Sequence, residues 1–246
     1  MRTLIYVPII HTSADLGSMA EHVAKRAINE LGQDLWTRHR ETVDGFWQVV
    51  SDSFETMDVK GVKIYQDGMI ADGPVGRQIV EETARAGSQN YQLILKLLER
   101  GAVLVKTEDF GLVKKEYDRL QTITRAKTTM QKIIALIQYK WTKTRLLHKR
   151  DAFIAQTIDQ SLGSDERAIL FIGAFHNTYK MLSKDIQILE IKEAAKVKQY
   201  QKLLPLYHKH SQQFDDLGRY LVLPIANCTD NDERKKSIEC RPESEM

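Results

Sequence analysis

Five short runs of apolar residues, rich in isoleucine and valine, recur along the chain, and longer mixed segments separate them. Each run is continuous rather than alternating, which is typical of a strand buried on both faces of a parallel sheet. The pattern therefore predicts five strands, at residues 3–10, 62–65, 102–105, 168–172 and 186–191.

Between these runs, apolar residues recur every three or four positions, as on one face of a helix. This spacing predicts helices over residues 18–31, 42–54 and 75–99, the last of them ending at Gly101. Strands that alternate with long helical connections indicate an α/β fold with a mostly parallel central sheet and flanking helices.

The segment 111–162 differs from the rest because it contains no proline and no glycine after its first residue. We expect a long helical insertion there, as a hairpin or a lid. Residues 119–150 include nine Lys or Arg and no Asp or Glu, a local excess of +9. Such a segment is either a solvated cationic face or a surface that attracts an anionic ligand, partner or RNA.

Composition adds few constraints. The chain has 246 residues and a formal charge of only +3, so the total charge does not favour nucleic acid or membrane. We expect one α/β domain over residues 1–226 and a disordered tail over 227–246, which contains Cys228 and Cys240. Few cysteines, no apolar run near 20 residues and no convincing signal peptide predict a cytoplasmic protein without a membrane span.

Two of the predicted strands end at a histidine. The first runs into His11, and the fourth passes through Gly173 to His176, which we expect in the first turn of a following helix. Parallel strands share one carboxyl edge, where ligands bind in such sheets. A side chain that titrates near neutral pH and also binds metals is well placed there.

A charged pair precedes the strand of His176. Arg150 and Asp151 stand at the start of an apolar helical stretch, residues 152–158, that leads into it. An Arg–Asp pair in a pocket can orient an imidazole or bind an oxyanion. The plain alternative is a surface ion pair, which contributes little.

The Arg150-Asp151 pair and the Gly173–His176 turn resemble the C-terminal signature of the TraB, Tiki and erythromycin-esterase-like superfamily. In that superfamily the first strand also ends in a Gly-Xaa-Xaa-His turn, which residues 8–11 resemble, so the likeness spans residues 3 to about 191. It implies an α/β fold with a long helical insertion. It also implies hydrolysis of peptide or ester bonds by the histidines, with a divalent metal in the Tiki branch.

Two positions depart from the superfamily's pattern. Pro8 replaces the first glycine and lacks the amide hydrogen that a glycine there would offer to an oxyanion. After the second strand, where the superfamily commonly has glutamate, this chain has the shorter Asp67.

The resemblance leads to the hypothesis of a hydrolase that acts on a peptide or a small molecule. His11, His176 and Asp67 would hold a divalent ion such as Mn, Zn or Fe, whose bound water attacks the substrate. Arg150 would stabilise charge on the scissile carbonyl, and Asp151 would assist. Without metal, one histidine would act as the general base.

Other classes of function stay open at this point. A non-catalytic binding or regulatory protein would sense an anionic ligand, or dock a partner or nucleic acid, through the basic segment. That segment is also a natural surface for a homodimer. His39 and His148 lie among cationic neighbours and are expected to face solvent. The chain has no P-loop and no Gly-Xaa-Ser-Xaa-Gly elbow, which disfavours ATP hydrolysis and serine-hydrolase chemistry.

Overall fold

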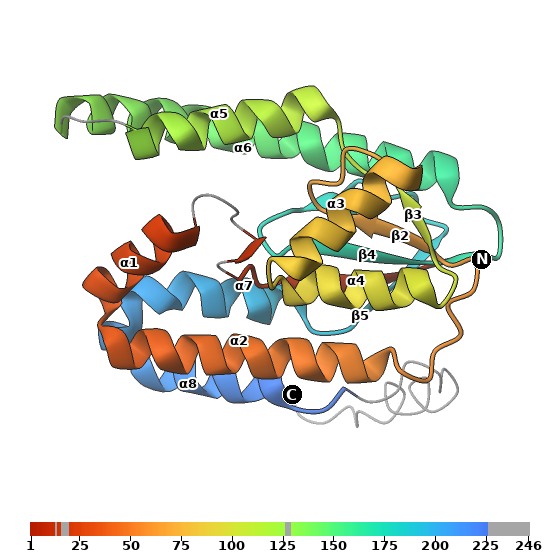
Figure 1. The fold of residues 1–246 in the computed structure, drawn as a ribbon, viewed down its shortest axis with the longest axis horizontal. Helices are drawn as coiled ribbons and strands as arrows, with labels where there is room; N and C mark the ends of the chain where they lie inside the picture. Colours follow the sequence, from red (N-terminus) through yellow and green to blue (C-terminus); the bar gives the residue numbers. More distant parts are fainter. Residues whose placement is uncertain (13, 16–19, 126–128, 226–246) are drawn as a thin grey trace, which may run out of the picture.

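The fold is that of a computed structural model, which describes the chain except for residues 13, 16–19, 126–128 and 226–246 (Figure 1). Side chains are also left out at 20–23, 26–27, 120, 123–125 and 129–143. The predicted disordered tail with its two cysteines, and most cations of the basic segment, therefore lie outside the described residues.

The centre of the molecule is one parallel sheet in the order β3-β2-β4-β1-β5. All five predicted strands are confirmed within two residues at each end. Their bounds are Arg2–Ile9 (β1), Lys63–Gln66 (β2), Val103–Val105 (β3), Arg167–Gly173 (β4) and Ile186–Glu190 (β5). The α/β class is confirmed with them.

Each strand sends alternate side chains to opposite faces of the sheet. In β1, Ile5, Val7 and Ile9 enter the larger apolar cluster, whereas Leu4 and Tyr6 enter the smaller one. Both faces are buried, which explains why the strands read as continuous apolar runs.

In the described part of the chain, eight α-helices connect and flank the strands, as Figure 1 shows. The larger cluster is completed by residues of α2, α3, α4, α7 and α8, and the smaller one by the C-terminal part of α6. The helices are Ala20–Leu31 (α1), Gln33–Ser53 (α2), Gly73–Arg85 (α3), Gln89–Glu99 (α4), Phe110–Arg125 (α5), Thr129–Ser161 (α6), Ala194–Leu203 (α7) and Tyr207–Val222 (α8).

The prediction of a single helix over residues 75–99 is wrong, because the segment forms α3 and α4. Gly87 separates them with a φ of +97°, a left-handed conformation that favours glycine. The Ser88 hydroxyl then accepts a hydrogen bond from the Tyr91 amide and begins α4.

Helices α5 and α6 occupy the segment predicted as a helical hairpin or lid. They lie side by side and extend well beyond the sheet (Figure 1). Among the described side chains of α6, those of its C-terminal part pack on the strands through Ile154 and Ile158, and Leu162 joins them just after the helix ends. No helix within the described ranges is long and apolar enough to cross a membrane.

Candidate active site at the carboxyl edge of the sheet

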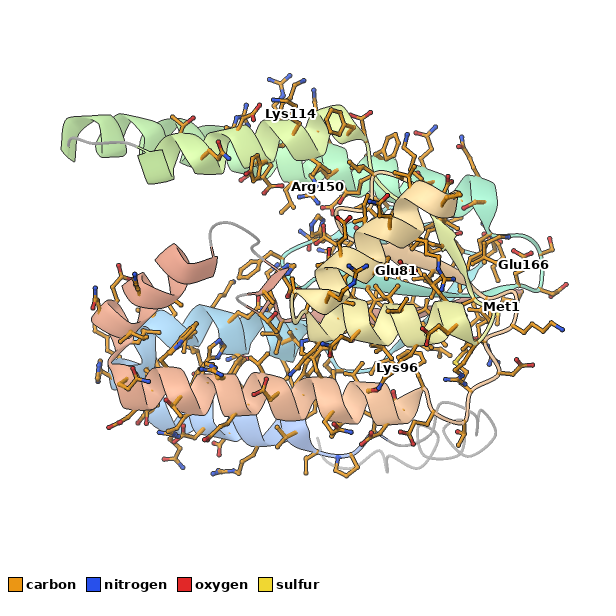
Figure 2. The ribbon with its side chains drawn as sticks, in the orientation of Figure 1. Met1, Glu81, Lys96, Lys114, Arg150 and Glu166 are labelled. Carbon is orange, nitrogen blue, oxygen red and sulfur yellow. The ribbon has the colours of Figure 1, made fainter. Side chains whose placement is uncertain are left out.

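Four neighbouring strands each deliver an ionisable side chain to the same edge of the sheet. In the order of the sheet, Glu108 follows β3, Asp67 follows β2, His176 follows β4 and His11 follows β1. Helix α6 adds Arg150, labelled in Figure 2, and its neighbour Asp151; Arg150 bonds to Asp67 and Asp151 to His176. Ionisable residues from five elements therefore meet where parallel α/β sheets bind their ligands.

Asp151 holds His176 in place. Its Oδ1 lies 2.6 Å from Nδ1 of the imidazole and accepts the Thr178 hydroxyl at 2.9 Å. Its Oδ2 accepts the backbone N–H of Asn177 at 3.1 Å. These bonds fix the ring's orientation and leave Nε2 to face the edge of the sheet.

A second carboxylate faces that nitrogen. Asp67 Oδ2 lies 3.4 Å from His176 Nε2 and accepts the Gly173 amide at 3.1 Å. Burial opposes a charged ring, but Asp67 and Asp151 outweigh it and raise the pKa of His176 to about 10. At neutral pH the ring is therefore an imidazolium between two carboxylates.

The pKa values of the two carboxyl groups move in the opposite direction. Burial alone would raise the pKa of Asp67, but the charges of His176 and Arg150 hold it well below its usual value. The pKa of Asp151 is likewise lowered, because its bonds to His176 outweigh burial. Both groups are ionised at neutral pH.

Gly173 marks the point at which three of the predicted site residues meet. A Cβ placed there would lie 3.1 Å from Asp67 Oδ2, 3.4 Å from His11 Nε2 and 3.6 Å from His176 Cδ2. The three side chains therefore surround one small space that only glycine leaves open. His11, Asp67 and His176, far apart in sequence, share this space as the strand-tip argument predicts.

Arg150 is bound by three carboxylates. Its Nε donates to Glu108 at 2.8 Å and its Nη2 to Asp67 at 2.5 Å, with further bonds to Glu108 and Glu116. These contacts raise the pKa of Arg150 although its burial opposes them. Four of its five N–H groups bond to carboxylates, so Arg150 positions Asp67, and its role toward a substrate oxyanion stays a prediction.

The interpretation of Arg150 and Asp151 as a surface ion pair is wrong. Both side chains are buried, and each bonds to partners elsewhere in the fold. Asp151 also lies within the 33-residue helix α6 and not at a helix start. The two neighbours thus contribute separately, Arg150 to the carboxylates and Asp151 to the imidazole.

Two further expectations about histidines need correction. His176 lies in a turn, where its amide donates to Gly173 O at 3.0 Å, before the short 3₁₀ helix Thr178–Lys180 and not inside a helix. His39 does not face solvent. It is buried against Tyr200, 3.0 Å from that hydroxyl, and burial lowers its pKa to about 4. His148 is exposed, as predicted.

Sequence reasoning missed Glu108 and Glu116. Glu108 is fully buried, and burial raises its pKa although Arg150 and the Gly68 amide bond to it. A signal for it exists, because Glu108 follows the third strand as Asp67 follows the second. Glu116 on α5 gives no such signal, since only the packing of α5 on α6 brings it to Arg150.

The three predicted metal ligands do not fit an ion in their present arrangement. Asp67 already accepts Arg150 on one oxygen and the Gly173 amide on the other, and His176 Nε2 faces Asp67. Within the described parts of the chain, no group of three or more His, Cys, Asp or Glu is arranged to hold a metal ion. The divalent ion therefore stays a prediction.

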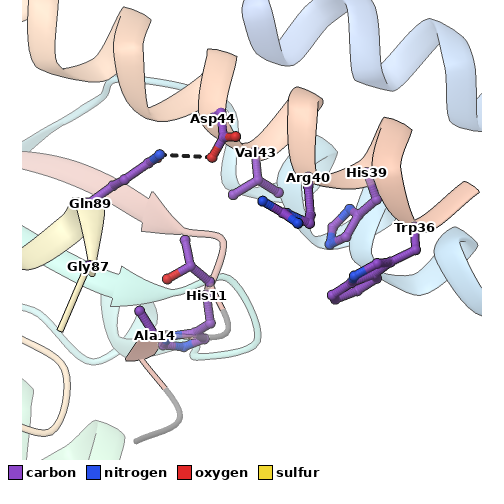
Figure 3. A pocket seen from close by; sticks show the side chains of 10 residues that line it. His11, Ala14, Trp36, His39, Arg40, Val43, Asp44, Gly87 and Gln89 are labelled. Carbon is purple, nitrogen blue, oxygen red and sulfur yellow. Dashed lines mark hydrogen bonds between the residues drawn. The ribbon is translucent and has the colours of Figure 1, made fainter. Parts of the chain in front are cut away.

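A cavity opens beside His11 (Figure 3). Its volume is about 290 Å³, and its lining includes His11 from the end of β1 and Trp36, His39 and Arg40 from α2. The His11 side chain is 48% exposed, in contrast to His176 at 5%. His11 thus connects the buried charged cluster with a space large enough for part of a substrate.

Comparison with protein-family models, with curated proteins and with solved structures found no match. The resemblance to the TraB and Tiki superfamily thus stays a prediction from the sequence. Fold and site together define a class only: an α/β protein whose parallel sheet carries a buried charged cluster at its carboxyl edge.

Proposed function

We propose that the protein is a hydrolase that cleaves a peptide or ester bond at this edge of the sheet. The observation that supports the proposal is the meeting of His11, Asp67 and His176 around Gly173, next to a cavity. Ionisable groups with perturbed pKa values in such a place are typical of active sites.

Each side chain has a different role in the proposed reaction, set by its burial and its bonding partners. His11 is accessible and takes a proton from the attacking water, then returns it to the leaving amine or alcohol, a role that contributes roughly 10²–10⁴-fold. The His176 imidazolium, whose two nitrogens face Asp151 and Asp67, holds Asp67 in place and contributes positive charge near the scissile carbonyl oxygen rather than a hydrogen bond to it. Asp151 fixes that ring, and Arg150 fixes Asp67.

The cavity beside His11 receives the substrate. Trp36 offers an apolar surface and Arg40 a cation, while Asp44 is held by Gln89 at 2.8 Å. These features suit a small molecule or peptide that carries both an apolar group and a polar or anionic one.

The test is a panel of fluorogenic peptides and nitrophenyl esters with purified protein. The double variant His11→Ala with His176→Ala is expected to lose turnover while circular dichroism shows a folded chain. His148→Ala, an exposed histidine outside the site, serves as the matched control and is expected to retain full turnover. Hydrolysis that survives the double substitution would contradict the proposal.

The metal hypothesis has its own test. Elemental analysis after purification without chelators, followed by addition of Mn, Zn or Fe, shows whether an ion binds and whether turnover needs it. Turnover that is unchanged by a strong chelator, in protein free of bound ion, supports the histidine-based route. Turnover that is lost when the ion is removed and restored when the ion is added back contradicts that route.

A further inference from the structure

A second concave site lies between α5 and α6, apart from the cluster at the sheet edge. It has a volume of about 350 Å³ and is lined by six residues. Two leucines form its apolar part and four cations surround them: Leu112, Lys115 and Arg119 from α5, and Arg145, Leu146 and Lys149 from α6. We call it the cationic groove.

Nearby carboxylates do not neutralise these cations. Asp118 pairs with Lys114 at 2.6 Å, Glu116 bonds to Arg150, and Asp109 accepts the Leu112 amide at 2.9 Å. Among the described residues, none of the four groove cations forms an ion pair. The groove therefore concentrates positive charge that no ion pair within the described part of the chain balances.

Repulsion between these cations destabilises the pair of helices α5 and α6. Lys115 and Arg119 are four residues apart on one helix, and Arg145 and Lys149 are four apart on the other. Like charges at this spacing destabilise a helix, and the groove brings both pairs together. An anion bound between the helices would remove the repulsion and link α5 to α6.

We propose that the cationic groove binds a small soluble anion that carries two or more phosphate groups. Two guanidinium groups can each bind phosphate through two hydrogen bonds, and two ammonium groups add charge. The volume matches a small-molecule site, and the two leucines give the bound molecule an apolar contact. This site does not depend on the proposed hydrolase activity.

The experiment uses the full chain and inorganic tripolyphosphate as probe, with thermal unfolding and calorimetry at matched ionic strength. We expect saturable binding of the wild type and a rise of several degrees in Tm. The variant Arg145→Gln with Lys149→Gln is expected to unfold at a higher temperature than the wild type without ligand. The same variant should bind tripolyphosphate at least tenfold more weakly.

The matched control is Lys202→Gln with Lys209→Gln, which removes two exposed cations outside the groove. It should bind tripolyphosphate as the wild type does. No saturable binding by the wild type, or equal weakening in both variants, would overturn the proposal. Binding of single-stranded RNA or of vesicles with phosphoinositide, without binding of tripolyphosphate, would overturn it in favour of a macromolecular or membrane surface.

Discussion

His176 shows how one residue's environment decides its charge. The ring is buried, which favours its neutral form, yet carboxylates lie at both of its nitrogens, 2.6 Å from Nδ1 and 3.4 Å from Nε2. The carboxylates prevail and raise its pKa to about 10. A charged imidazole at neutral pH is thus part of the resting site, and it leaves the general-base role to His11.

The raised pKa of His176 makes stability depend on pH. Its contribution is fully present below pH 6.5, the ordinary value, and is lost as the pH rises toward about 10. We therefore expect the wild type to lose a few kcal/mol of unfolding free energy, relative to His176→Gln, between these values. Urea unfolding of both proteins across this range measures it, and a constant difference would contradict the assignment.

For single residues, the sequence predicts where a side chain lies in the fold better than it predicts whether that side chain is buried. His11 and His176 are found at the strand tips because continuous apolar runs locate the strands. His39 is buried against Tyr200, and its cationic sequence neighbours give no hint of that packing. Glu108 was missed although the third strand was predicted, because two residues separate it from the end of that strand, whereas Asp67 directly follows the second.

At the scale of elements, α6 contacts both the sheet and the charged cluster at its edge. Its C-terminal part packs on the sheet, and one turn earlier it presents Arg150 and Asp151 to the cluster. A helical insertion was predicted over residues 111–162, but the pair was placed at the start of a helical stretch, whereas α6 runs through Arg150 and Asp151 without a break. The break between α3 and α4 at Gly87 was missed because apolar periodicity continues across it.

Arg150 should be essential for stability. Arg150→Met leaves Glu108 and Asp67 buried without their cation, which typically costs about 3–5 kcal/mol. Arg77→Met, which breaks the exposed pair with Glu81, should cost less than about 1 kcal/mol. Chemical denaturation measures both, and equal losses would show that the buried network contributes no more than a surface pair.

Glu116 tests the link between α5 and α6. Its side chain is 22% exposed and bonds to Arg150 from α5. Glu116→Ala should cost roughly 1–3 kcal/mol and speed amide exchange in α5, because one charged bond between the helices is lost. Hydrogen exchange followed by mass spectrometry measures this. Exchange in β4 should stay unchanged, and faster exchange throughout the chain would point to global destabilisation instead.

At the scale of the whole molecule, the order β3-β2-β4-β1-β5 creates the site. It places β4 between β2 and β1, so the ends of three strands that are distant in sequence meet around Gly173. The sequence predicted the strands and the residues at their tips. It did not give their order, because order depends on how the helical connections pack and not on any local pattern.

Gly173→Ala probes this meeting point while every ionisable group is kept. Gly173 is not among the glycines with positive φ, so the backbone accepts alanine. The added Cβ would lie 3.1 Å from Asp67 Oδ2 and 3.4 Å from His11 Nε2, tight enough to displace them. Gly218→Ala is the matched control, since its Cβ meets nothing closer than 3.7 Å.

The most direct measurement is kcat/KM of these two variants on the best substrate from the panel, with Tm recorded for each. A small misplacement of reacting groups can cost about 10²-fold, so Gly173→Ala should lose at least that much while Gly218→Ala matches the wild type. Wild-type turnover in a folded Gly173→Ala protein would contradict the claim that His11, Asp67 and His176 act together at this point.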